Sequence, residues 1–158
     1  MVTGVDIVKE QIRIAFGLPL SYKQEDIKIN GYAIECRINC ENVRNKFMPS
    51  CGKVDIVHIP GGNGVRIDSF LYQEYEISPY YDSMIAKLIV HGKTRQEALY
   101  KLRRAMEEFI VEGISTNLSL IYLLTYEIQF IKGTYKTNFI EENLDRILEI
   151  GEAFDHTL

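Results

Sequence analysis

The sequence predicts an α+β fold in which a unit of short antiparallel strands is followed by packed helices. Alternating apolar and polar residues, broken by glycine and proline turns, are concentrated between residues 31 and 91. From residue 94 onward, apolar residues recur instead at steps of three and four, which is typical of helices. Because strands and helices are segregated along the chain, an α+β architecture is favoured over an alternating α/β one.

An amphipathic helix is predicted over residues 5–15. Its apolar residues recur at steps of three and four, at Val5, Val8, Ile12 and Ala15. Thr3 and Asp6 have the spacing of a capping box, with aspartate in place of glutamate. Gly17 and Pro19 then end the helix, and a polar connection leads to the strands.

Residues 31–40 alternate strictly and predict a half-buried strand. Its apolar face consists of Tyr32, Ile34, Cys36, Ile38 and Cys40. Glu35 and Arg37 therefore lie on the opposite, polar face. We expect residues 41–50 to form a loop, because they contain Pro49 and proline disfavours a regular strand.

Three further strands are expected in the same unit. The first covers residues 53–59 and is followed by a glycine turn. The second runs from residue 65 to about residue 71. The third, residues 83–91, is largely apolar, which predicts burial on both of its faces.

Three helices are predicted after the strands. The helix over residues 94–109 opens with the capping-box spacing of Thr94 and Glu97. The helix over residues 115–133 begins with a Ser-Thr-Asn run and ends at a glycine. The last helix covers residues 138–150 and also begins with a capping pattern.

Length and composition predict one domain. The chain has 158 residues, 46% of them apolar, which is enough to bury a single core. We expect residues 1–150 to form that domain. Residues 151–158 lack periodicity and are expected to form a flexible tail.

Charge and hydropathy exclude two classes of partner. The net charge is −4 and the basic residues are dispersed, so no surface for nucleic acid is expected. No apolar run is long enough to cross a membrane. Asp6 and Lys9 stand where a secretory signal would be apolar. We therefore expect a soluble, cytoplasmic protein without nucleic-acid or membrane partners.

The cysteines predict neither a metal site nor a disulfide framework. Cys36, Cys40 and Cys51 are odd in number, and no second pair of ligands follows at the spacing of a zinc site. His58 and His91 stand alone. Free thiols in a reducing cytoplasm are expected, and no metal ligands are predicted.

The most informative segment is the glycine-rich turn at residues 60–64 and the strand that follows it. Val65 and Ile67 share one face of that strand, so Arg66 projects from the other. A strand arginine beside a glycine turn is a rigid fork of donors that suits a carboxylate, a phosphate or a developing oxyanion. The alternative is an ordinary surface salt bridge.

Other polar residues of neighbouring strands could complete a site around Arg66. These residues are Glu35, Arg37, Asp68, Asp82 and Lys87. If their faces meet in one sheet, a carboxylate such as Glu35 or Asp82 could bind the Arg66 guanidinium and hold its orientation toward a ligand. The alternative is cross-strand salt bridging, which contributes less than about 1 kcal/mol at a surface.

Several kinds of catalytic motif are absent from the sequence. It contains no Walker-type phosphate loop, and its glycine turn opens no predicted helix, so it is not a dinucleotide fingerprint. No arrangement of serine, cysteine or histidine indicates nucleophilic catalysis. The residues alone therefore support an α+β domain with one arginine of interest.

Four ordered motifs resemble those of a known family. They are Glu35-Cys36-Arg37-Ile38-Asn39, the stretch from Pro60 to Arg66, the stretch from Pro79 to Leu88, and Glu112-Gly113-Ile114-Ser115-Thr116-Asn117. Together they look like the carboxyl-terminal lobe of biotin carboxylase, and residues 1–6 also resemble that family. The sequence departs at Cys51, where proline is frequent, and at Cys40, where alanine is common.

The resemblance implies a part of a larger enzyme. Family members phosphorylate bicarbonate with ATP to give carboxyphosphate, which delivers CO₂ to biotin held on a biotin carboxyl carrier protein. The amino-terminal and ATP-grasp lobes, with most of the ATP and magnesium sites, would precede Met1. The family's essential arginine corresponds to Arg66, which is implied to bind bicarbonate and to stabilise the ureido oxygen of biotin.

The resemblance also implies a homodimer, with an interface near the turn that contains His91 and Arg95. A different class of function remains open, in which the same fold is a non-catalytic module for dimerisation or carrier docking. The chain as it stands is expected to be inactive. The parent enzyme could carboxylate acetyl-CoA, propionyl-CoA or pyruvate, because this lobe does not contact the final acceptor.

Overall fold

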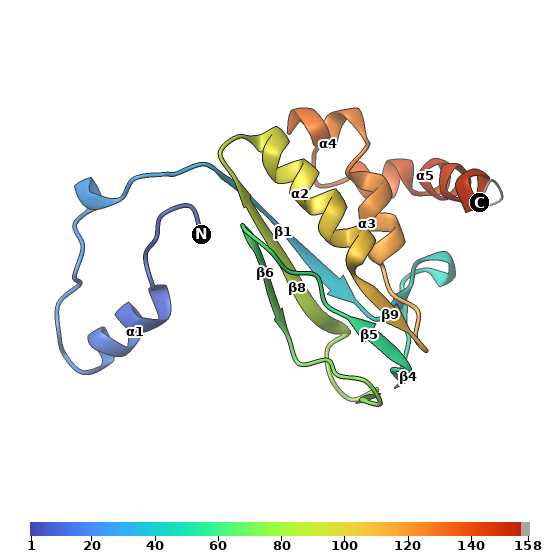
Figure 1. Ribbon diagram of the computed structural model, residues 1–158, viewed down its shortest axis with the longest axis horizontal. Helices are drawn as coiled ribbons and strands as arrows, with labels where there is room; N and C mark the ends of the chain where they lie inside the picture. Colours follow the sequence, from blue (N-terminus) through green and yellow to red (C-terminus); the bar gives the residue numbers. More distant parts are fainter. Residues whose placement is uncertain (156–158) are drawn as a thin grey trace.

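The computed structural model describes residues 1–155, and Figure 1 shows their arrangement. In chain order the helices and strands are α1 (Ile7–Ala15), β1 (Tyr32–Asn39), β2 (Glu41–Asn42), β3 (Met48–Pro49), β4 (Gly52–Lys53), β5 (Ile56–His58), β6 (Val65–Ser69), β7 (Glu76–Ile77), β8 (Met84–Gly92), α2 (Arg95–Glu108), β9 (Ile110–Glu112), α3 (Leu118–Leu124), α4 (Ile128–Lys132) and α5 (Phe139–Asp155). The presence of both helices and strands, together with the antiparallel pairing of the strands, confirms the predicted α+β fold.

The central sheet has the strand order β1-β8-β6, and both pairings are antiparallel. Its middle strand, β8, is buried along most of its length, as its apolar sequence predicts. Helix α2 lies across one face of the sheet (Figure 1). This face receives every second residue of β1 and β8, so the predicted alternation is confirmed from Ile34 to Cys40, whereas Tyr32, also assigned to the buried face, is 52% exposed.

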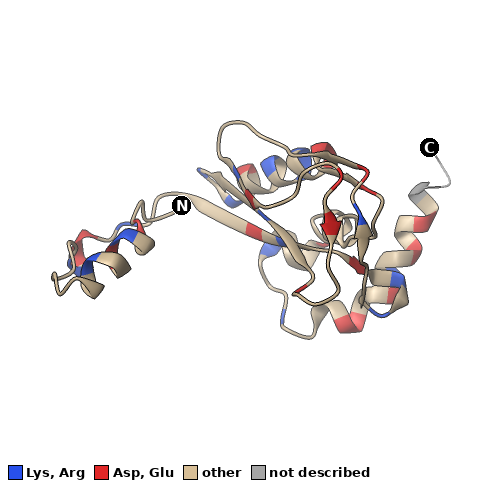
Figure 2. Cartoon of the chain, turned by 90° about the horizontal axis from the view of Figure 1, so that it is seen from below, with Lys and Arg blue, Asp and Glu red and all other residues tan. Residues whose placement is uncertain are grey.

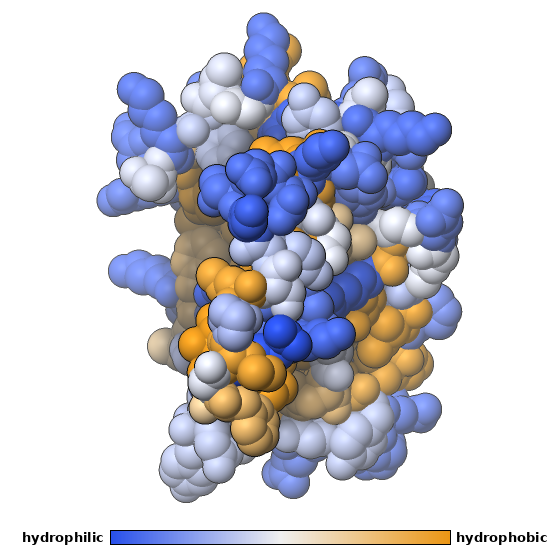
Figure 3. Space-filling view, turned by 90° about the vertical axis from the view of Figure 1, so that its left-hand side faces the viewer, coloured by the Kyte–Doolittle hydropathy of each residue, from blue (hydrophilic) through white to orange (hydrophobic). Residues whose placement is uncertain are grey.

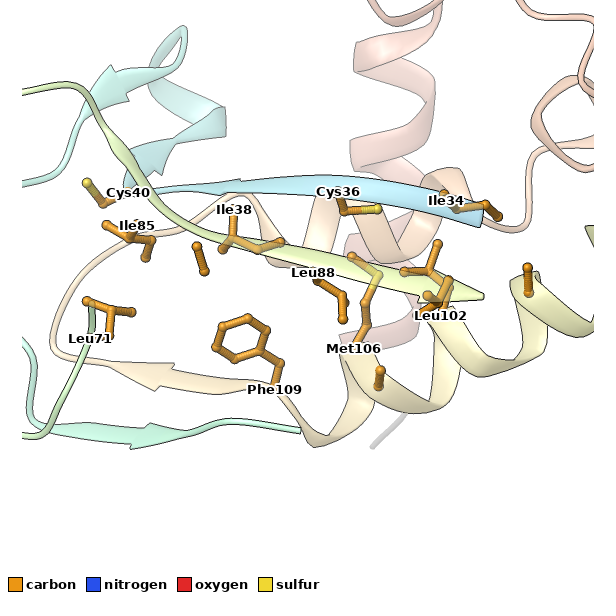
Figure 4. Close-up of a cluster of buried hydrophobic side chains, with 14 of the residues drawn as sticks. Ile34, Cys36, Ile38, Cys40, Leu71, Ile85, Leu88, Leu102, Met106 and Phe109 are labelled. Carbon is orange, nitrogen blue, oxygen red and sulfur yellow. The ribbon is translucent and has the colours of Figure 1, made fainter. Parts of the chain in front are cut away.

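The core lies between this face and α2 (Figure 4). Ile38, Leu88 and Leu102 are each 0% exposed, and Phe109 closes the end of the core beside β9. Cys36 is packed among them, and burial, together with the nearby Glu35 carboxylate, raises the pKa of its thiol to about 12. The buried thiol therefore acts as an apolar core group, in agreement with the absence of any predicted chemistry.

Helix α2 begins as its sequence predicts. The Oγ1 of Thr94 accepts a hydrogen bond of 3.1 Å from the Glu97 N–H. The Glu97 carboxylate accepts from the N–H of Lys93, one residue before the cap, so the reciprocal bond of the capping box is displaced by one residue. Gly92 precedes this turn, and a Cβ there would lie 2.6 Å from the Ala98 nitrogen.

Asn117 precedes α3, but its side chain does not cap that helix. Its Oδ1 accepts from the N–H of Asn39 at 2.9 Å, and its Nδ2 donates to the Arg37 carbonyl at 3.1 Å. The prediction of an ordinary cap at residues 115–117 is therefore wrong. Asn117 instead provides the backbone of β1 with two hydrogen bonds, which ties α3 to the outer edge of the central sheet.

The short strands differ from the prediction. Residues 41–50 contain the paired strands β2 and β3 instead of a loop. The strand predicted over residues 53–59 is divided into β4 and β5, which pair with β7 and β9. The strands β7 and β9 were not predicted, because pieces of two or three residues are too short to show alternation.

The later helices also differ in their bounds. The helix predicted over residues 115–133 is divided into α3 and α4, and it ends as expected at Gly133, which has a φ of 69°. The last helix continues past residue 150 to Asp155. The predicted tail is thus helical over residues 151–155, its flexibility stays a prediction, and residues 156–158 lie outside the described part of the chain.

Helix α1 is set apart from the sheet and is joined to β1 by an extended connection (Figure 1). Its cap is Asp6, whose side chain accepts from the Lys9 N–H, so the prediction that Thr3 caps the helix is wrong. The apolar side of this segment is exposed, with Ile7 at 67% and Phe16 at 81%. Figure 3 views the molecule from this side and shows apolar residues at its surface.

The surface carries both signs of charge, and Figure 2 shows acidic and basic residues interspersed over the chain. This distribution agrees with the dispersed basic residues of the sequence. Among residues 1–155, no helix combines the length and the apolar character that crossing a bilayer requires.

Helix α1 should be the least protected helix of the isolated chain. A nine-residue helix with an exposed apolar side lacks the packing that stabilises short helices in water. We expect amides of residues 7–15 to exchange at least about a hundredfold faster than interior amides of α2, measured by hydrogen–deuterium exchange. Comparable protection in the two helices would contradict this expectation.

The substitution Asn117→Ala should destabilise the chain by about 1–3 kcal/mol, because it leaves a backbone donor and acceptor of β1 without partners. The urea denaturation midpoint measures the loss. Asn45→Ala is the control, since the exposed Asn45 side chain donates only to the Met48 sulfur among the described contacts. Equal midpoints for the two variants would contradict the proposed structural role.

Candidate active site

The face of the central sheet opposite α2 carries polar side chains in two register rows. Glu35, Ile89 and Arg66 lie across β1, β8 and β6 in the first row. Arg37, Lys87 and Asp68 form the second row in the same way. Because alternate residues of a strand point to opposite faces, both rows point away from the core. We call this surface the open face.

The glycine turn fixes the start of β6 beside this face. Gly64 has a φ of 77°, and its carbonyl accepts a 2.8 Å hydrogen bond from the N–H of His91. A Cβ on Gly64 would lie 2.6 Å from the His91 carbonyl oxygen. A side chain at residue 64 is therefore excluded both by backbone conformation and by the close approach to β8. The turn thus sets the register that places Arg66 on the open face.

Arg66 forms a bidentate ion pair with Asp68, two residues further along β6. Its Nε donates to Oδ1 at 2.8 Å and its Nη2 donates to Oδ2 at 3.0 Å. The Nζ of Lys87 lies 3.8 Å from the same carboxylate. The Arg66 hydrogen bonds and charge, with a smaller contribution from Lys87, hold the pKa of Asp68 below its usual value. The same pair raises the pKa of Arg66, so the guanidinium stays charged.

The two carboxylates predicted to support Arg66 do not contact it. Glu35 shares its register row, but Ile89 lies between them, and Glu35 instead pairs with Arg37 at 3.7 Å. Asp82 lies in the turn before β8, where its Oδ1 accepts from the N–H of Met84. The carboxylate that contacts Arg66 is Asp68, which period two already places on the same face.

The two predicted interface residues have contacts within the chain. The Nε2–H of His91 donates to the Asn30 carbonyl at 2.7 Å, at the entrance to β1. The guanidinium of Arg95 donates to the carbonyls of Phe130 and Ile131, and it lies 5.5 Å from the centre of the Phe130 ring. Their role in a dimer stays a prediction.

Two hollows border the sheet and the helices. One, of about 240 Å³, lies against β6 and β8 and is lined in part by Asp68 and Lys87, beside the Arg66 ion pair. The other, of about 910 Å³, lies among α2, β9, α3 and α5 and is lined largely by apolar residues. Within residues 1–155, no group of three histidine, cysteine or acidic residues is placed to hold a metal ion.

The chemistry of the open face follows from these groups. A charged guanidinium in a fixed orientation can bind an anion and can stabilise negative charge on an oxygen atom. No group of three histidine, cysteine or acidic side chains that could hold a metal ion accompanies it among the described residues. The site can therefore contribute electrostatic stabilisation to a reaction.

Residues 35–142 match the family model described as the biotin carboxylase C-terminal domain. The chain is 52% identical over 141 residues to biotin carboxylase 1 of Bacillus subtilis, which covers 89% of this chain and 31% of that protein. It is also 52% identical over 144 residues to the biotin carboxylase of Haemophilus influenzae, covering 91% of this chain and 32% of that protein. The chain thus spans about a third of the length of these curated relatives.

Solved structures give the same result. The biotin carboxylase domain dimer of 2-oxoglutarate carboxylase from Hydrogenobacter thermophilus, in complex with MgADP, ADP and bicarbonate, superposes with a TM-score of 0.90 at 44% identity. The match covers 93% of this chain and 32% of that one. Fold, the order of the four sequence motifs and sequence identity therefore agree, and the chain belongs to the biotin carboxylase C-terminal domain family.

Proposed function

We propose that this chain acts as the C-terminal lobe of an ATP-dependent biotin carboxylase, in which Arg66 binds the bicarbonate-derived anion and stabilises the ureido oxygen of biotin. The observation that carries the proposal is the exposed guanidinium of Arg66, which is held on the open face beside the Gly64 turn. The bicarbonate complex of the Hydrogenobacter thermophilus domain, at 44% identity, supports this substrate class.

The proposed role follows from where charge develops during the reaction. When the ureido nitrogen of biotin loses its proton to a base, negative charge develops on the ureido oxygen, and this charge passes to the new carboxylate as the nitrogen attacks CO₂. A donor that is already oriented toward that oxygen stabilises the transition state without reorganising. The raised pKa of Arg66 means that the group acts as a charged hydrogen-bond donor and not as a proton-transfer acid.

The described residues lack the metal-ligand cluster and the phosphate-binding loop that would bind MgATP. No three acidic, cysteine or histidine side chains gather within residues 1–155, and the glycine turn leads into β6 instead of a helix. We therefore propose that ATP and magnesium are bound mainly by other lobes of the enzyme. Biotin would reach Arg66 on its carrier protein.

A homodimer is a further part of the proposal. The related 2-oxoglutarate carboxylase domain is a dimer in its solved structure, and His91 and Arg95 are our candidates for the equivalent contact. The second candidate function is a non-catalytic module for dimerisation or carrier docking. The exposed donor edge of Arg66 favours the enzyme, because a scaffold has no need of an oriented guanidinium at an open surface.

The chain by itself should show no bicarbonate-dependent ATPase activity, since its described residues provide neither a phosphate loop nor a metal-binding cluster. A coupled assay for ADP release measures this activity. The Arg66→Met variant serves as the control for contaminating enzyme, because a contaminant is unaffected by the substitution. ADP release that scales with this chain and falls in the variant would contradict the proposal.

The substitution Arg66→Met should lower the turnover of a complete enzyme by about two to three orders of magnitude, which is typical for the loss of one donor to a developing oxyanion. A chimera in which this chain replaces the matching segment of Bacillus subtilis biotin carboxylase 1 provides that enzyme. Stability should change by less than about 1 kcal/mol, because the lost ion pair is largely exposed.

Arg146→Met is the matched control for this experiment. Arg146 also donates to a carboxylate at 2.8 Å, from Glu127, but it lies on α5. Biotin carboxylation and the denaturation midpoint are measured on the same preparations. Full activity in Arg66→Met, or a loss of stability large enough to explain the missing activity, would contradict the catalytic role of Arg66 and indicate a structural one.

A further inference from the structure

We propose that Asp68 is a positioning residue that determines which edge of the Arg66 guanidinium is presented to substrate. The inference rests on the proposed role of Arg66 and adds the group that sets its orientation. Asp68 acts through Arg66 and requires no contact with substrate.

The geometry of the ion pair defines the edges. A guanidinium offers two usable forks of N–H donors, one along its side through Nε and Nη2 and one at its end through Nη1 and Nη2. Asp68 accepts from Nε and Nη2, at 2.8 and 3.0 Å, and so occupies the side fork. The end fork remains open, and its paired donors match the two oxygens of a bicarbonate-like anion.

Asp68 is itself well placed to hold this orientation. It lies opposite Lys87 in the register of β6 with β8, and the Lys87 Nζ is 3.8 Å from its Oδ2. Its side chain is 33% exposed, compared with 61% for Arg66. Among the described residues, Asp68 is the only hydrogen-bond or ion-pair partner of the Arg66 side chain. The orientation of a long, flexible side chain thus depends on one short and better-buried carboxylate.

A competing role for Asp68 makes opposite predictions. If the carboxylate only reduced the positive charge near Arg66, its removal would strengthen the attraction of an anion, and the KM for bicarbonate would fall while kcat stayed unchanged. If Asp68 positions the guanidinium, its removal lets Arg66 adopt other rotamers, and kcat falls because fewer molecules hold the reactive geometry.

Asp68→Asn in the chimeric carboxylase separates the two roles. We expect kcat to fall by about 10- to 100-fold, as for other small misplacements of a catalytic group, without a decrease in the KM for bicarbonate. Asp68→Ser should behave in the same way, and Asp68→Glu should recover part of the activity because it restores a carboxylate. Glu127→Gln, which removes the carboxylate of the matched Arg146 pair, should leave kcat unchanged.

A spectroscopic measurement on this chain tests the orientation without any activity. The ¹⁵N-coupled Nε–H signal of Arg66 is assigned by its absence in Arg66→Met. We expect its exchange with solvent to accelerate at least about tenfold in Asp68→Asn and Asp68→Ser, because the bond to Oδ1 is weakened or lost. Glu127→Gln should leave the signal unchanged.

The outcomes distinguish this inference from the proposed function. Unchanged turnover in Arg66→Met would overturn the role of Arg66 and, with it, that of Asp68. A large loss in Arg66→Met together with unchanged kcat in Asp68→Asn and Asp68→Ser would overturn only the role of Asp68. An unchanged exchange rate at Arg66 in both Asp68 variants would do the same.

Discussion

The antiparallel pairing of β8 with both β1 and β6 is the constraint on which the fold and the site depend. Leu88 and Val90 of this strand are 0% exposed in the core, whereas Lys87 and the buried Ile89 lie on the opposite side of the sheet. Because the side-chain period is two, a shift of one residue would turn the charged groups inward and the core residues outward. Core burial therefore fixes the register, and the register in turn assembles the open face from three strands.

Much of this arrangement could be predicted from the sequence, because its signals are long and local. The alternation of residues 31–40 and the apolar run of residues 83–91 predict β1 and β8, and the flanking Val65 and Ile67 predict the direction of Arg66. Other features depend on distant partners. β9 forms only by pairing with β5, more than fifty positions earlier, and Asn117 bonds to β1 instead of its own helix.

The carboxylate beside Arg66 also shows that contacts between distant strands cannot be predicted from the sequence. Period two places both Glu35 and Asp68 on the face of the sheet that carries Arg66. Only the strand order shows that β8, with Ile89, separates Glu35 from the arginine, and a strand order cannot be read from alternation. The pair between Arg66 and Asp68 is local to β6, so five residues of one strand contain both the charge and the group that orients it.

The junction between the amino-terminal segment and the sheet has a mechanical consequence. The connection from α1 is fastened to the sheet where His91 binds the Asn30 carbonyl, and Gly31 then leads into β1. A force applied to residues 1–30 is thus transmitted to the edge strand β1 and to the end of β8. Arg66 and Asp68 lie on β6, at the opposite edge of the sheet. Because the N–H of His91 also donates to the Gly64 carbonyl, a single residue joins the entrance of β1 to the turn that precedes Arg66.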